Sequence, residues 1–421
     1  MSLDAFSLPQ LLLVLPIFIA AFILLLTLIV FFHEYGHFSV ARLLGVRVDT
    51  FSIGFGKPIA TWTDEKGTEW RIAWLPLGGY VKFFGDAGPA SNASGDVQEE
   101  KDAGMATTQF PRPGEEEKVG RGMTPEEKAV CFHFKPLWRR AAIVAAGPIA
   151  NFILAAVFFW GLLVTFGEPV TEPRVGQVVE GSAAQEAGLL PGDLIIAING
   201  KSVASFNDMS RIISLSSGET LTLTVEREGA VLEIPATPRR QERKDGFGNT
   251  IRIGTLGVSS DPNATVFVDY GPVSAAPKAV ARVWGVLETT VTFIGRLVLG
   301  KEDPSQLGGP LKMAQFAGQS ALSGFDDTLY VTELGVLEKL RISLANFIQL
   351  AAVVSVSIGF LNLLPVPVLD GGHLMYYAYE GVAGRPLGVK AQEIGFRVGL
   401  AMLASLMLFV TWNDINSFFS S

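Results

Sequence analysis

An apolar run without a charged side chain, residues 11–32, constrains this chain more than any other feature of the sequence. At about 1.5 Å per residue, a helix of this length crosses the hydrocarbon core of a bilayer, which is about 30 Å thick. Residues 141–166 and 342–369 are also uncharged, and residues 398–412 form a shorter run that Arg397 can anchor at the interface. The sequence therefore predicts a polytopic α-helical membrane protein with four transmembrane helices.

The overall composition agrees with an integral membrane protein and argues against other classes. Hydrophobic residues make up 49% of the chain and charged residues only 18%. The formal net charge of −8 argues against a nucleic-acid partner, which would require a basic face. Cys131 is the only cysteine, so neither an intramolecular disulfide nor a Cys-based zinc site can form. We expect a lipid bilayer, and no nucleic acid, among the partners.

The first apolar run leads directly into His33-Glu34-Tyr35-Gly36-His37, an H-E-x-x-H pattern. On a helix the two histidines lie one turn apart on the same face, so both imidazoles can bind one Zn²⁺. Glu34 lies beside them, where its carboxylate can take a proton from water at the metal. The pattern predicts hydrolytic zinc chemistry at membrane depth, with Glu34 as the catalytic base.

A hydrolytic zinc site takes a third protein ligand, and the sequence offers several candidates. Asp370 ends a long apolar run, where a bare carboxylate costs about 2.5–3.5 kcal/mol and a divalent cation would relieve that cost. Alternatively, Asp370 is the N-cap of the next helix. We expect His133 to have a structural role. His373 is either a ligand or a residue that orients Asp370.

Two prolines, Pro365 and Pro367, prevent a regular helix immediately before Asp370. Irregular backbone inside a membrane is tolerated only where it is buried or lines a wet cavity, and a hydrolase needs such a cavity for water. Asn362 lies on the same approach. It is predicted to bind a substrate backbone or an oxyanion, and the alternative is an interhelical hydrogen bond.

Basic residues near the ends of the apolar runs predict the orientation of the chain. Arg42 and Arg47 follow the first run, and Arg139 and Arg140 precede the second, so the segment between them is predicted to be cytoplasmic. Both termini then lie outside the cytoplasm. The first ten residues contain an acid and neither Lys nor Arg, so we interpret residues 1–45 as a retained transmembrane segment rather than a signal peptide.

Residues 46–84 alternate in the manner of strands, with glycine breaks and a predicted turn at residues 64–67. They predict a small β-sheet rich in aromatic residues, next to the first helix. The sheet is either an ordinary soluble hairpin or a membrane-associated element that captures an unwound substrate by strand pairing. For the second case, Gly78, Gly79 and Tyr80 are the candidate substrate-binding residues, because adjacent glycines allow close backbone approach.

Two further segments connect the predicted spans. Residues 85–135 are rich in Gly, Ala, Ser and Glu, and we expect a flexible cytoplasmic loop before the second transmembrane segment, residues 136–168. Residues 283–300 carry Glu288 and Arg296, so we expect an amphipathic helix in the membrane interface rather than a span. The prediction covers residues 270–340 as interfacial amphipathic helices and residues 341–421 as the third and fourth transmembrane helices.

Residues 170–262 change to a soluble α/β pattern and resemble a bacterial PDZ domain. The resemblance rests on residues 181–189 and 192–200, together with the strands predicted at 175–179, 221–227 and 231–235. PDZ domains bind extended peptides at a sheet edge, which implies a peptide or an ectodomain as ligand. The alternative is a small packing domain.

Taken together, these motifs resemble the site-2 protease family, in its bacterial RseP branch. The resemblance rests on the inserted PDZ-like domain and on residues 33–37, 147–152 and 362–372, and it covers nearly the whole chain. It implies a zinc-dependent intramembrane endopeptidase whose metal ligands are the motif histidines and the aspartate of Leu-Asp-Gly, here His33, His37 and Asp370. The motif glutamate, Glu34, is the implied base.

The resemblance also implies substrates and a location. Bacterial members cut trimmed single-pass anti-sigma proteins, so we expect single-pass membrane proteins as substrates. We expect the bacterial inner membrane, with the termini and the PDZ domain on the periplasmic side and the active site near the cytoplasmic side. The family often carries two tandem PDZ domains, whereas this sequence has room for one.

Three other classes compete with this interpretation. The PDZ insertion and the Leu-Asp-Gly-Gly segment argue against a zinc enzyme that processes prenylated tails. The intact Glu34 argues against a non-catalytic receptor or chaperone with a structural metal. A metal transporter would require paired broken helices, which the predicted spans lack.

Overall fold

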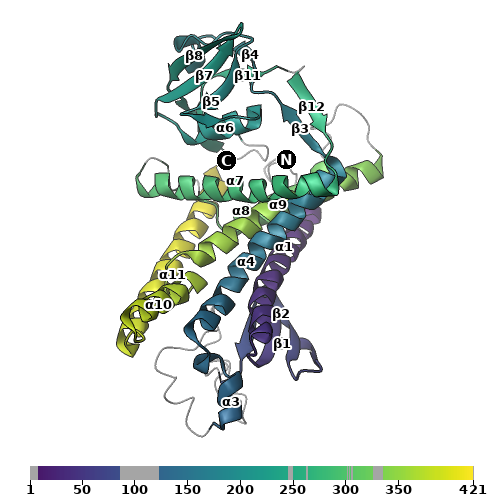
Figure 1. Cartoon of the computed structure of the whole chain (residues 1–421). Helices are drawn as coiled ribbons and strands as arrows, with labels where there is room; N and C mark the ends of the chain where they lie inside the picture. The colour runs from purple at the N-terminus through teal and green to yellow at the C-terminus, as the bar shows by residue number, and fades with distance from the viewer. Residues whose placement is uncertain are drawn as a thin grey trace. The chain divides into compact units, whose positions relative to one another are not determined.

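The computed structural model describes residues 8–85, 123–244, 250–261, 264–300, 302, 304, 307–325 and 335–420 (Figure 1). The chain divides into two compact units. The first unit is formed mainly by residues 159–307, and the second by residues 8–158 together with residues 308–421.

The described part of the chain contains four helices that are long and apolar enough to cross a membrane, as predicted. These helices are α1 (Leu8–Leu43), α4 (Leu137–Phe166), α9 (Val336–Leu363) and α11 (Val389–Ser420).

Their ends differ from the predicted runs for local reasons. The H-E-x-x-H segment lies inside α1, which continues to Leu43 because nothing between the motif and Gly45 interrupts the helix. α9 ends at Leu363 rather than at residue 369, since Pro365 and Pro367 follow. α11 extends well beyond residues 398–412 at both ends. Charged residues at helix ends lengthen the helix without lengthening the apolar run.

The helix α8 (Pro310–Leu322) lies in the region predicted to form interfacial amphipathic helices, residues 270–340. α8 packs along α1, where Ala317 joins Leu25 and Ile29 in a buried apolar cluster. Gly318 faces the ring of Phe18 so closely that a Cβ atom would lie 2.1 Å from it. Small residues on this face allow the two helices to approach, which an amphipathicity argument does not detect.

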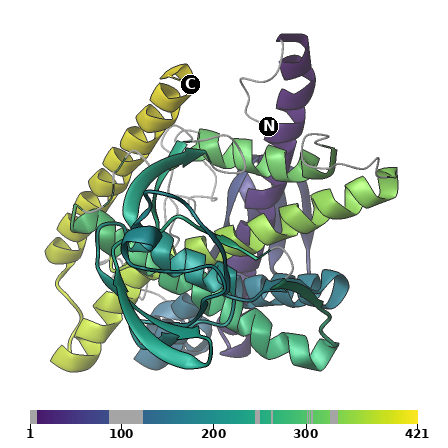
Figure 2. The same ribbon diagram turned by 90° about the horizontal axis from the view of Figure 1, so that it is seen from above.

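The last transmembrane helix is tied to the start of α8 by a buried carboxylate. Asp414 of α11 accepts hydrogen bonds from the backbone N–H groups of Gly309, Leu311 and Lys312, at 2.8, 3.0 and 3.1 Å. These N–H groups have no partner within the helix, and a negative charge is favourable at a helix N-terminus. α11 and α1 lie on opposite sides of this unit (Figures 1 and 2).

The predicted β-sheet is formed by β1 (Val48–Thr63) and β2 (Glu69–Phe83), which pair antiparallel. The turn between them begins at Asp64, whose carboxylate accepts hydrogen bonds from the backbone of Thr68, the indole of Trp70 and the guanidinium of Arg42. Burial raises the pKa of Asp64, but these hydrogen bonds outweigh it and lower the pKa to about 2. The Arg42 contact fastens the sheet to the end of α1.

The prediction of a flexible loop over residues 85–135 is wrong for its last part, and residues 86–122 lie outside the described residues. α3 (Pro125–Val130) begins with a capping box in which Thr124 and Glu127 satisfy each other's backbone N–H groups. A 3₁₀ turn (Phe132–Phe134) follows, and Phe132 is buried against Phe83 of β2. The composition of the segment does not reveal the local T-x-x-E pattern, which predicts the start of a helix.

In the first unit, an inserted domain occupies the region predicted as PDZ. Its main sheet has the strand order β6-β5-β7-β8, and all neighbouring strands are antiparallel. The core is apolar and includes Ile195, Leu223 and Met209. The strands and helices that form it are β4 (Val175–Val178), α5 (Ala183–Glu186), β5 (Leu194–Ile198), β6 (Lys201–Ser202), α6 (Phe206–Leu215), β7 (Leu221–Arg227), β8 (Ala230–Ala236), β9 (Arg239–Lys244), β10 (Thr250–Thr255) and β11 (Val258–Ser260).

The chain enters and leaves the inserted domain through one short ribbon. β3 (Glu168–Thr171) pairs antiparallel with β12 (Thr265–Val268), and Glu172 N–H donates to the carbonyl of Ala264 at 3.0 Å. β3 directly follows α4, and β12 leads into α7 (Pro272–Val298). The domain is therefore a true insertion whose two connections lie side by side.

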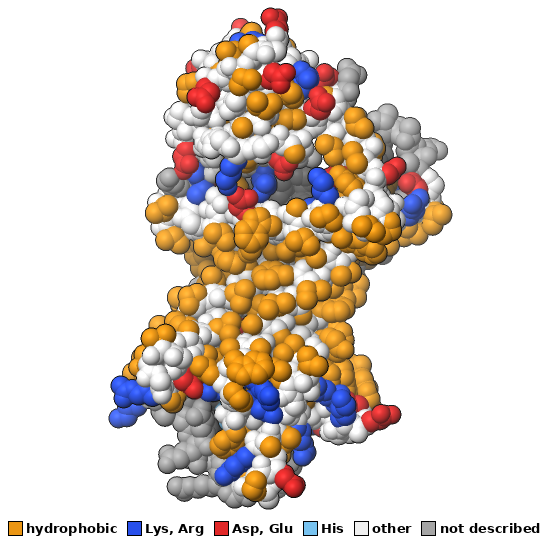
Figure 3. All heavy atoms as spheres, viewed as in Figure 1, with side chains coloured by type: hydrophobic (Ala, Val, Ile, Leu, Met, Phe, Trp, Pro, Cys, Tyr) orange, Lys and Arg blue, Asp and Glu red, His pale blue; other side chains and the backbone are white. Residues whose placement is uncertain are grey.

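Side-chain types are segregated on the surface of the second unit. On the face shown in Figure 3, hydrophobic side chains cover its long helices, whereas Lys and Arg side chains gather at the end that carries β1, β2 and α3. This pattern agrees with apolar helices that lie in lipid and a basic end in water.

Candidate metal centre

Three buried side chains meet between α1 and the start of α10 (Asp370–Ala383). Nε2 of His33 lies 3.3 Å from Nε2 of His37, and Oδ2 of Asp370 lies 3.2 and 3.4 Å from these two atoms. The two histidines are 8% and 4% exposed, and Asp370 is 3% exposed. The structure thus brings together the residues that the sequence analysis proposed as metal ligands.

These distances fit a zinc ion. Three corners of a tetrahedron that are about 3.3 Å apart lie about 2.0 Å from its centre, which is the usual zinc–nitrogen or zinc–oxygen bond length. In addition, Oδ2 of Asp370 is buried and receives no hydrogen bond from the described residues. A buried carboxylate oxygen without a donor is costly unless a cation neutralises it.

Both imidazole rings are held so that Nε2 points to the meeting point. Nδ1 of His37 lies 2.8 Å from the carbonyl oxygen of Ile143 on α4. A carbonyl can only accept, so Nδ1 carries the proton and Nε2 offers its lone pair. Nδ1 of His33 lies 3.3 Å from the side-chain amide of Asn151, also on α4. α4 therefore fixes the orientation of both rings.

The backbone before α10 folds back across the first turn of that helix. Val368, two residues before Asp370, has a φ of 154°, which β-branched residues rarely adopt. A Cβ atom on Gly371 would lie 2.3 Å from the carbonyl oxygens of Leu363 and Leu364, and one on Gly372 would lie 2.4 Å from that of Val366. Both glycines after Asp370 are thus required by close backbone approach.

Asp370 does not act as the helix N-cap, which was the alternative role. Leu369 occupies the cap position, and no side chain caps the helix there. The carboxylate of Asp370 is therefore directed to the histidines rather than to the first turn of α10.

Glu34 is half-buried one position after His33, and β2 passes directly beside it. A Cβ atom on Gly79 would lie 3.2 Å from Cγ of Glu34 and 2.9 Å from the carbonyl oxygen of Ser52. Gly79 thus allows the strand to approach the predicted base.

The neighbours of Gly79 have a different environment. A Cβ atom on Gly78 would lie 2.3 Å from the ring of Phe55, and the ring of Tyr80 stacks on Phe55 with centroids 6.4 Å apart. Of the three predicted substrate-binding residues on β2, Gly79 is the one that the structure places against Glu34.

The other candidates lie outside the three-residue group. His373 is on α10, with its ring edge-on to that of Tyr376. His133 is in the 3₁₀ turn after α3, where burial and the nearby Arg140 lower its pKa to about 4. Asn362 is half-buried in the last turn of α9. Within the described residues, His33, His37 and Asp370 form the metal-binding group.

Two residues of α4 contact the metal-binding group although no site role was predicted for them individually. Asn151 is fully buried, and besides its contact with His33 its backbone carbonyl accepts a hydrogen bond from Ser355 of α9 at 2.8 Å. Gly147 lies one turn before it, against both histidines. In the sequence both residues entered only as part of the segment 147–152. The signal that could have identified them is an amide side chain one turn after a glycine within an apolar span.

We predict that Gly147→Ala weakens zinc binding. The added Cβ atom would lie 2.3 Å from Nε2 of His37 and 2.9 Å from Cε1 of His33, so both rings must move. Disturbing residues that orient metal ligands commonly costs about 10–100-fold in metal affinity. Zinc titration of the purified variant measures the loss.

Gly161→Ala is the matched control, because it lies on the same helix and its Cβ atom would meet nothing within 4 Å. This control is expected to bind zinc like the unaltered chain. Equal zinc affinity in both variants would contradict the role given to Gly147.

Proteins that are similar to this chain are named as metalloproteases. The model of peptidase family M50 matches residues 21–406. This chain belongs to peptidase family M50, the site-2 protease family. A protein of Agrobacterium fabrum that is named as a zinc metalloprotease is 43% identical over 402 residues, which cover 95% of this chain and 96% of the relative. Metalloprotease MmpA of Caulobacter vibrioides is 40% identical over 409 residues, 96% of each chain.

Family membership confirms several of the predictions made from the sequence. This M50 peptidase is a zinc-dependent metalloendopeptidase, and its apolar helices make it a membrane protein. It acts on membrane-protein substrates in contact with lipid. The assignment of His33, His37, Asp370 and Glu34 to particular roles stays a prediction that rests on the geometry described above.

Proposed function

We propose that this peptidase cuts the transmembrane segments of single-pass membrane proteins, with His33, His37 and Asp370 as zinc ligands. The observation that carries the proposal is the meeting of three donor atoms, 3.2–3.4 Å apart, two of which belong to α1, a helix long and apolar enough to cross a membrane. Anti-sigma factors or similar regulators are the proposed substrates, because release of a cytoplasmic fragment would turn such a cut into a signal.

The residues around the metal site have separate roles in the proposed reaction. Zinc, when bound, supplies a Lewis acid that acidifies water and polarises the scissile carbonyl. Glu34 accepts the proton of the attacking water and delivers it to the leaving amine. Ile143 and Asn151 hold the two imidazoles in place, so that little rearrangement is needed during the reaction. Asn362 is proposed to bind the substrate backbone on the approach to the site.

Cleavage of a defined peptide tests this function. We expect the purified chain, in lipid, to cut a synthetic transmembrane peptide within its apolar segment. A zinc chelator should stop the cleavage, and added zinc should restore it, because three protein ligands hold the metal reversibly. Mass spectrometry of the products locates the cut. Cleavage that persists in chelator, or that is confined to the flanking polar residues, would contradict the proposal.

We further propose that β2 holds the substrate in an extended form beside Glu34. A helical substrate keeps its carbonyl groups in internal hydrogen bonds, so it must unwind before attack. Gly79 supports this role because its missing side chain leaves β2 in contact with Glu34. A photoreactive residue at Tyr80 should cross-link to the synthetic transmembrane peptide. A photoreactive residue at Trp62, which is exposed near the turn between β1 and β2, should not. Equal labelling from both positions would argue against strand capture.

We propose that the inserted domain is a single PDZ domain that controls access to the site. The order of the strands and helices in the domain supports this proposal, and so does the segment 192–200. In that segment both carboxylate oxygens of Asp193 accept hydrogen bonds from Arg227 at 2.7 Å. A new C-terminus of a trimmed substrate, or a bulky ectodomain, is the proposed ligand.

Removing this domain tests its role. Because Glu172 and Ala264 are hydrogen-bonded neighbours, residues 173–260 can be replaced by a short linker. We expect the shortened chain to cut the short peptide at an unchanged rate, and to cut a peptide with a folded ectodomain at a changed rate. Loss of short-peptide cleavage while zinc stays bound would contradict a role in access.

We also propose that the active site lies near the cytoplasmic face of a bacterial inner membrane, with the termini and the inserted domain on the periplasmic side. The connection between α10 and α11, which carries Arg385 and is followed by Lys390 in the first turn of α11, lies at the same end of the second unit as α3 (Figure 1). Arg140 at the start of α4 forms a salt bridge with Glu380 of α10 at 2.6 Å, and this contact joins the start of α4 to the end of α10. Labelling of single cysteines from either side of intact cells would test this orientation.

A further inference from the structure

One face of α7 is apolar and exposed along the whole helix. Because each residue advances about 100° around an α-helix, positions spaced by four and seven fall within roughly 20° of one line. The side chains on this line are 89%, 62%, 67%, 47% and 80% exposed and belong to Val273, Val280, Trp284, Val291 and Val298. None is charged, and we call this line the α7 stripe.

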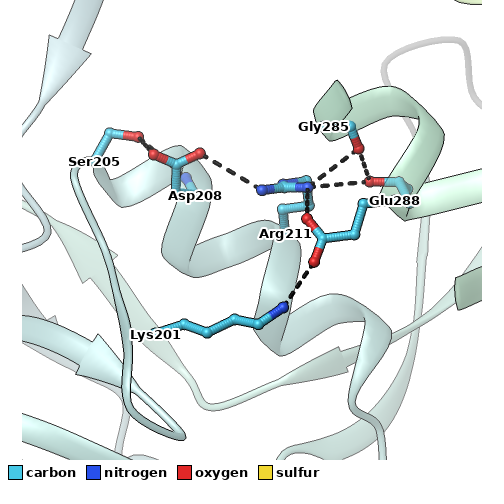
Figure 4. Close-up of polar contacts among 7 residues, drawn as sticks. Lys201, Ser205, Asp208, Arg211, Gly285 and Glu288 are labelled. Carbon is cyan, nitrogen blue, oxygen red and sulfur yellow. Dashed lines mark hydrogen bonds and ion pairs between the residues drawn. The ribbon is translucent and has the colours of Figure 1, made fainter. Parts of the chain in front are cut away.

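The opposite face of α7 is occupied by the inserted domain. Arg211 of α6 donates to the carbonyl of Gly285 at 3.2 Å and lies 3.6 Å from Glu288, and Lys201 lies 2.8 Å from the same carboxylate (Figure 4). The hydrogen bond from Lys201 lowers the pKa of Glu288, which keeps it ionised at neutral pH. These contacts reach α7 from one side only.

A second set of contacts fixes the other end of the same face. Arg296 of α7 is buried, and its guanidinium lies 2.8 Å from Glu219 and 2.9 Å from Glu302, and 3.2 Å from the carbonyl of Ser217. Glu219 and Ser217 belong to the inserted domain. Docking at both Gly285 and Arg296 prevents α7 from rolling, so the α7 stripe must point away from the domain.

The start of α7 is attached to the point where α4 leaves the membrane. The indole N–H of Trp160, near the end of α4, donates to the carbonyl of Pro272 at 2.7 Å. Arg282 of α7 lies 2.6 Å from Glu168, two residues after α4 ends, and Tyr270 donates to the same carboxylate at 3.2 Å. The first turns of α7 therefore lie at the membrane boundary that the end of α4 defines.

We propose that α7 lies flat on the bilayer surface, with the α7 stripe in lipid, and that its opposite face holds the inserted domain against the membrane. The continuity with α4 favours lipid over a protein as the occupant, since the stripe begins where a membrane span ends. A tryptophan near the middle of an uncharged stripe is typical of a helix at the headgroup level. Glu288, Arg282 and Arg296, on the flank and the opposite face of α7, contact the inserted domain, Glu168 and Glu302 rather than lipid.

Spin labels on the full-length chain in lipid vesicles test this arrangement. Val280 and Lys278 are both exposed and only two residues apart, but they lie on opposite sides of α7, so each is a control for the other. Cys131 is first replaced by Ala. We then compare collisions of each label with oxygen, which dissolves in lipid, and with a polar nickel complex, which stays in water.

The expected result is a reversal between the two positions. The label at Val280 should collide with oxygen several-fold more than with the nickel complex, and the label at Lys278 should do the opposite. Equal access of nickel to both labels would overturn the proposal, because the α7 stripe would face water. Shielding of the Val280 label from both reagents would also overturn it, because a protein, such as a second copy of this chain, would then cover the stripe.

Discussion

Replacing Glu34 by Gln leaves zinc in place and lowers the rate of peptide cleavage by about 10²–10⁴-fold, the usual contribution of general-base assistance. The side chain lies one position after His33 and outside the group of three buried ligands. Removal of its charge therefore takes away the proton acceptor but leaves all three metal anchors. Zinc content and cleavage of a transmembrane peptide, measured on the same preparation, check both halves of the prediction.

Tyr35→Phe is the matched control for this experiment. Tyr35 is the next residue on α1, and its ring stacks on Phe31, a contact that phenylalanine keeps. We expect this variant to retain zinc and activity. If Glu34→Gln loses zinc, the residue is a ligand rather than the base. If it cuts at the rate of the unaltered chain, the base must be sought elsewhere, and a receptor or chaperone with a structural metal would regain support.

Asp370→Ala should lose most of its zinc and, with it, nearly all activity. It removes one of three protein donors and the only negative charge among them. Asp370→Asn should be intermediate, because an amide oxygen can still reach the metal but does not neutralise it. Zinc stoichiometry and zinc affinity of the two purified variants distinguish these outcomes.

The control for Asp370 is Glu380→Gln on the same helix. Glu380 binds Arg140 and is not part of the three-residue group, so its variant is expected to hold zinc normally. Full zinc occupancy with normal activity in Asp370→Ala would remove Asp370 from the ligand set. His373, one turn further along α10, would then be the first candidate to replace it.

The loss of zinc affinity expected for the Asp370 variants follows from the burial of the metal ligands. The three donor side chains are almost fully enclosed, so water cannot readily substitute for a missing ligand. A buried carboxylate without its cation, or a cation without its carboxylate, is unfavourable in a low-dielectric environment. Metal binding and local structure are therefore expected to be lost together in the Asp370 variants.

Local patterns in the sequence are sufficient to predict a large part of the fold and of the candidate site. The spacing of His33 and His37 requires only that the segment is helical, and an uncharged run of membrane length requires a helix because lipid offers no partners for backbone groups. The turn at Asp64 was likewise readable, since its Asp and Gly residues fix the backbone locally. Such features depend on neighbours in sequence and not on distant segments.

The boundaries of elements were less predictable, even where the signal was local. α9 stops at Leu363 because Pro365 and Pro367 remove donors and clash with a continuing helix, whereas hydropathy alone extends the run to residue 369. The capping box at Thr124 organises α3 within a segment whose composition suggests disorder. In both cases a few specific backbone contacts outweigh the average character of the segment.

The sequence by itself determined the membrane spans, the two histidines with their glutamate, and the choice of Asp370 as a strong third candidate. Only the tertiary structure decided that Asp370 meets the histidines, that Gly147 must lack a side chain, and that Asn151 faces His33. The same holds for the direction of the α7 stripe, which depends on where Arg211 and Arg296 dock. The physical reason is that each of these properties is a distance between segments far apart in the chain, set by helix packing, which no pattern of neighbouring residues contains.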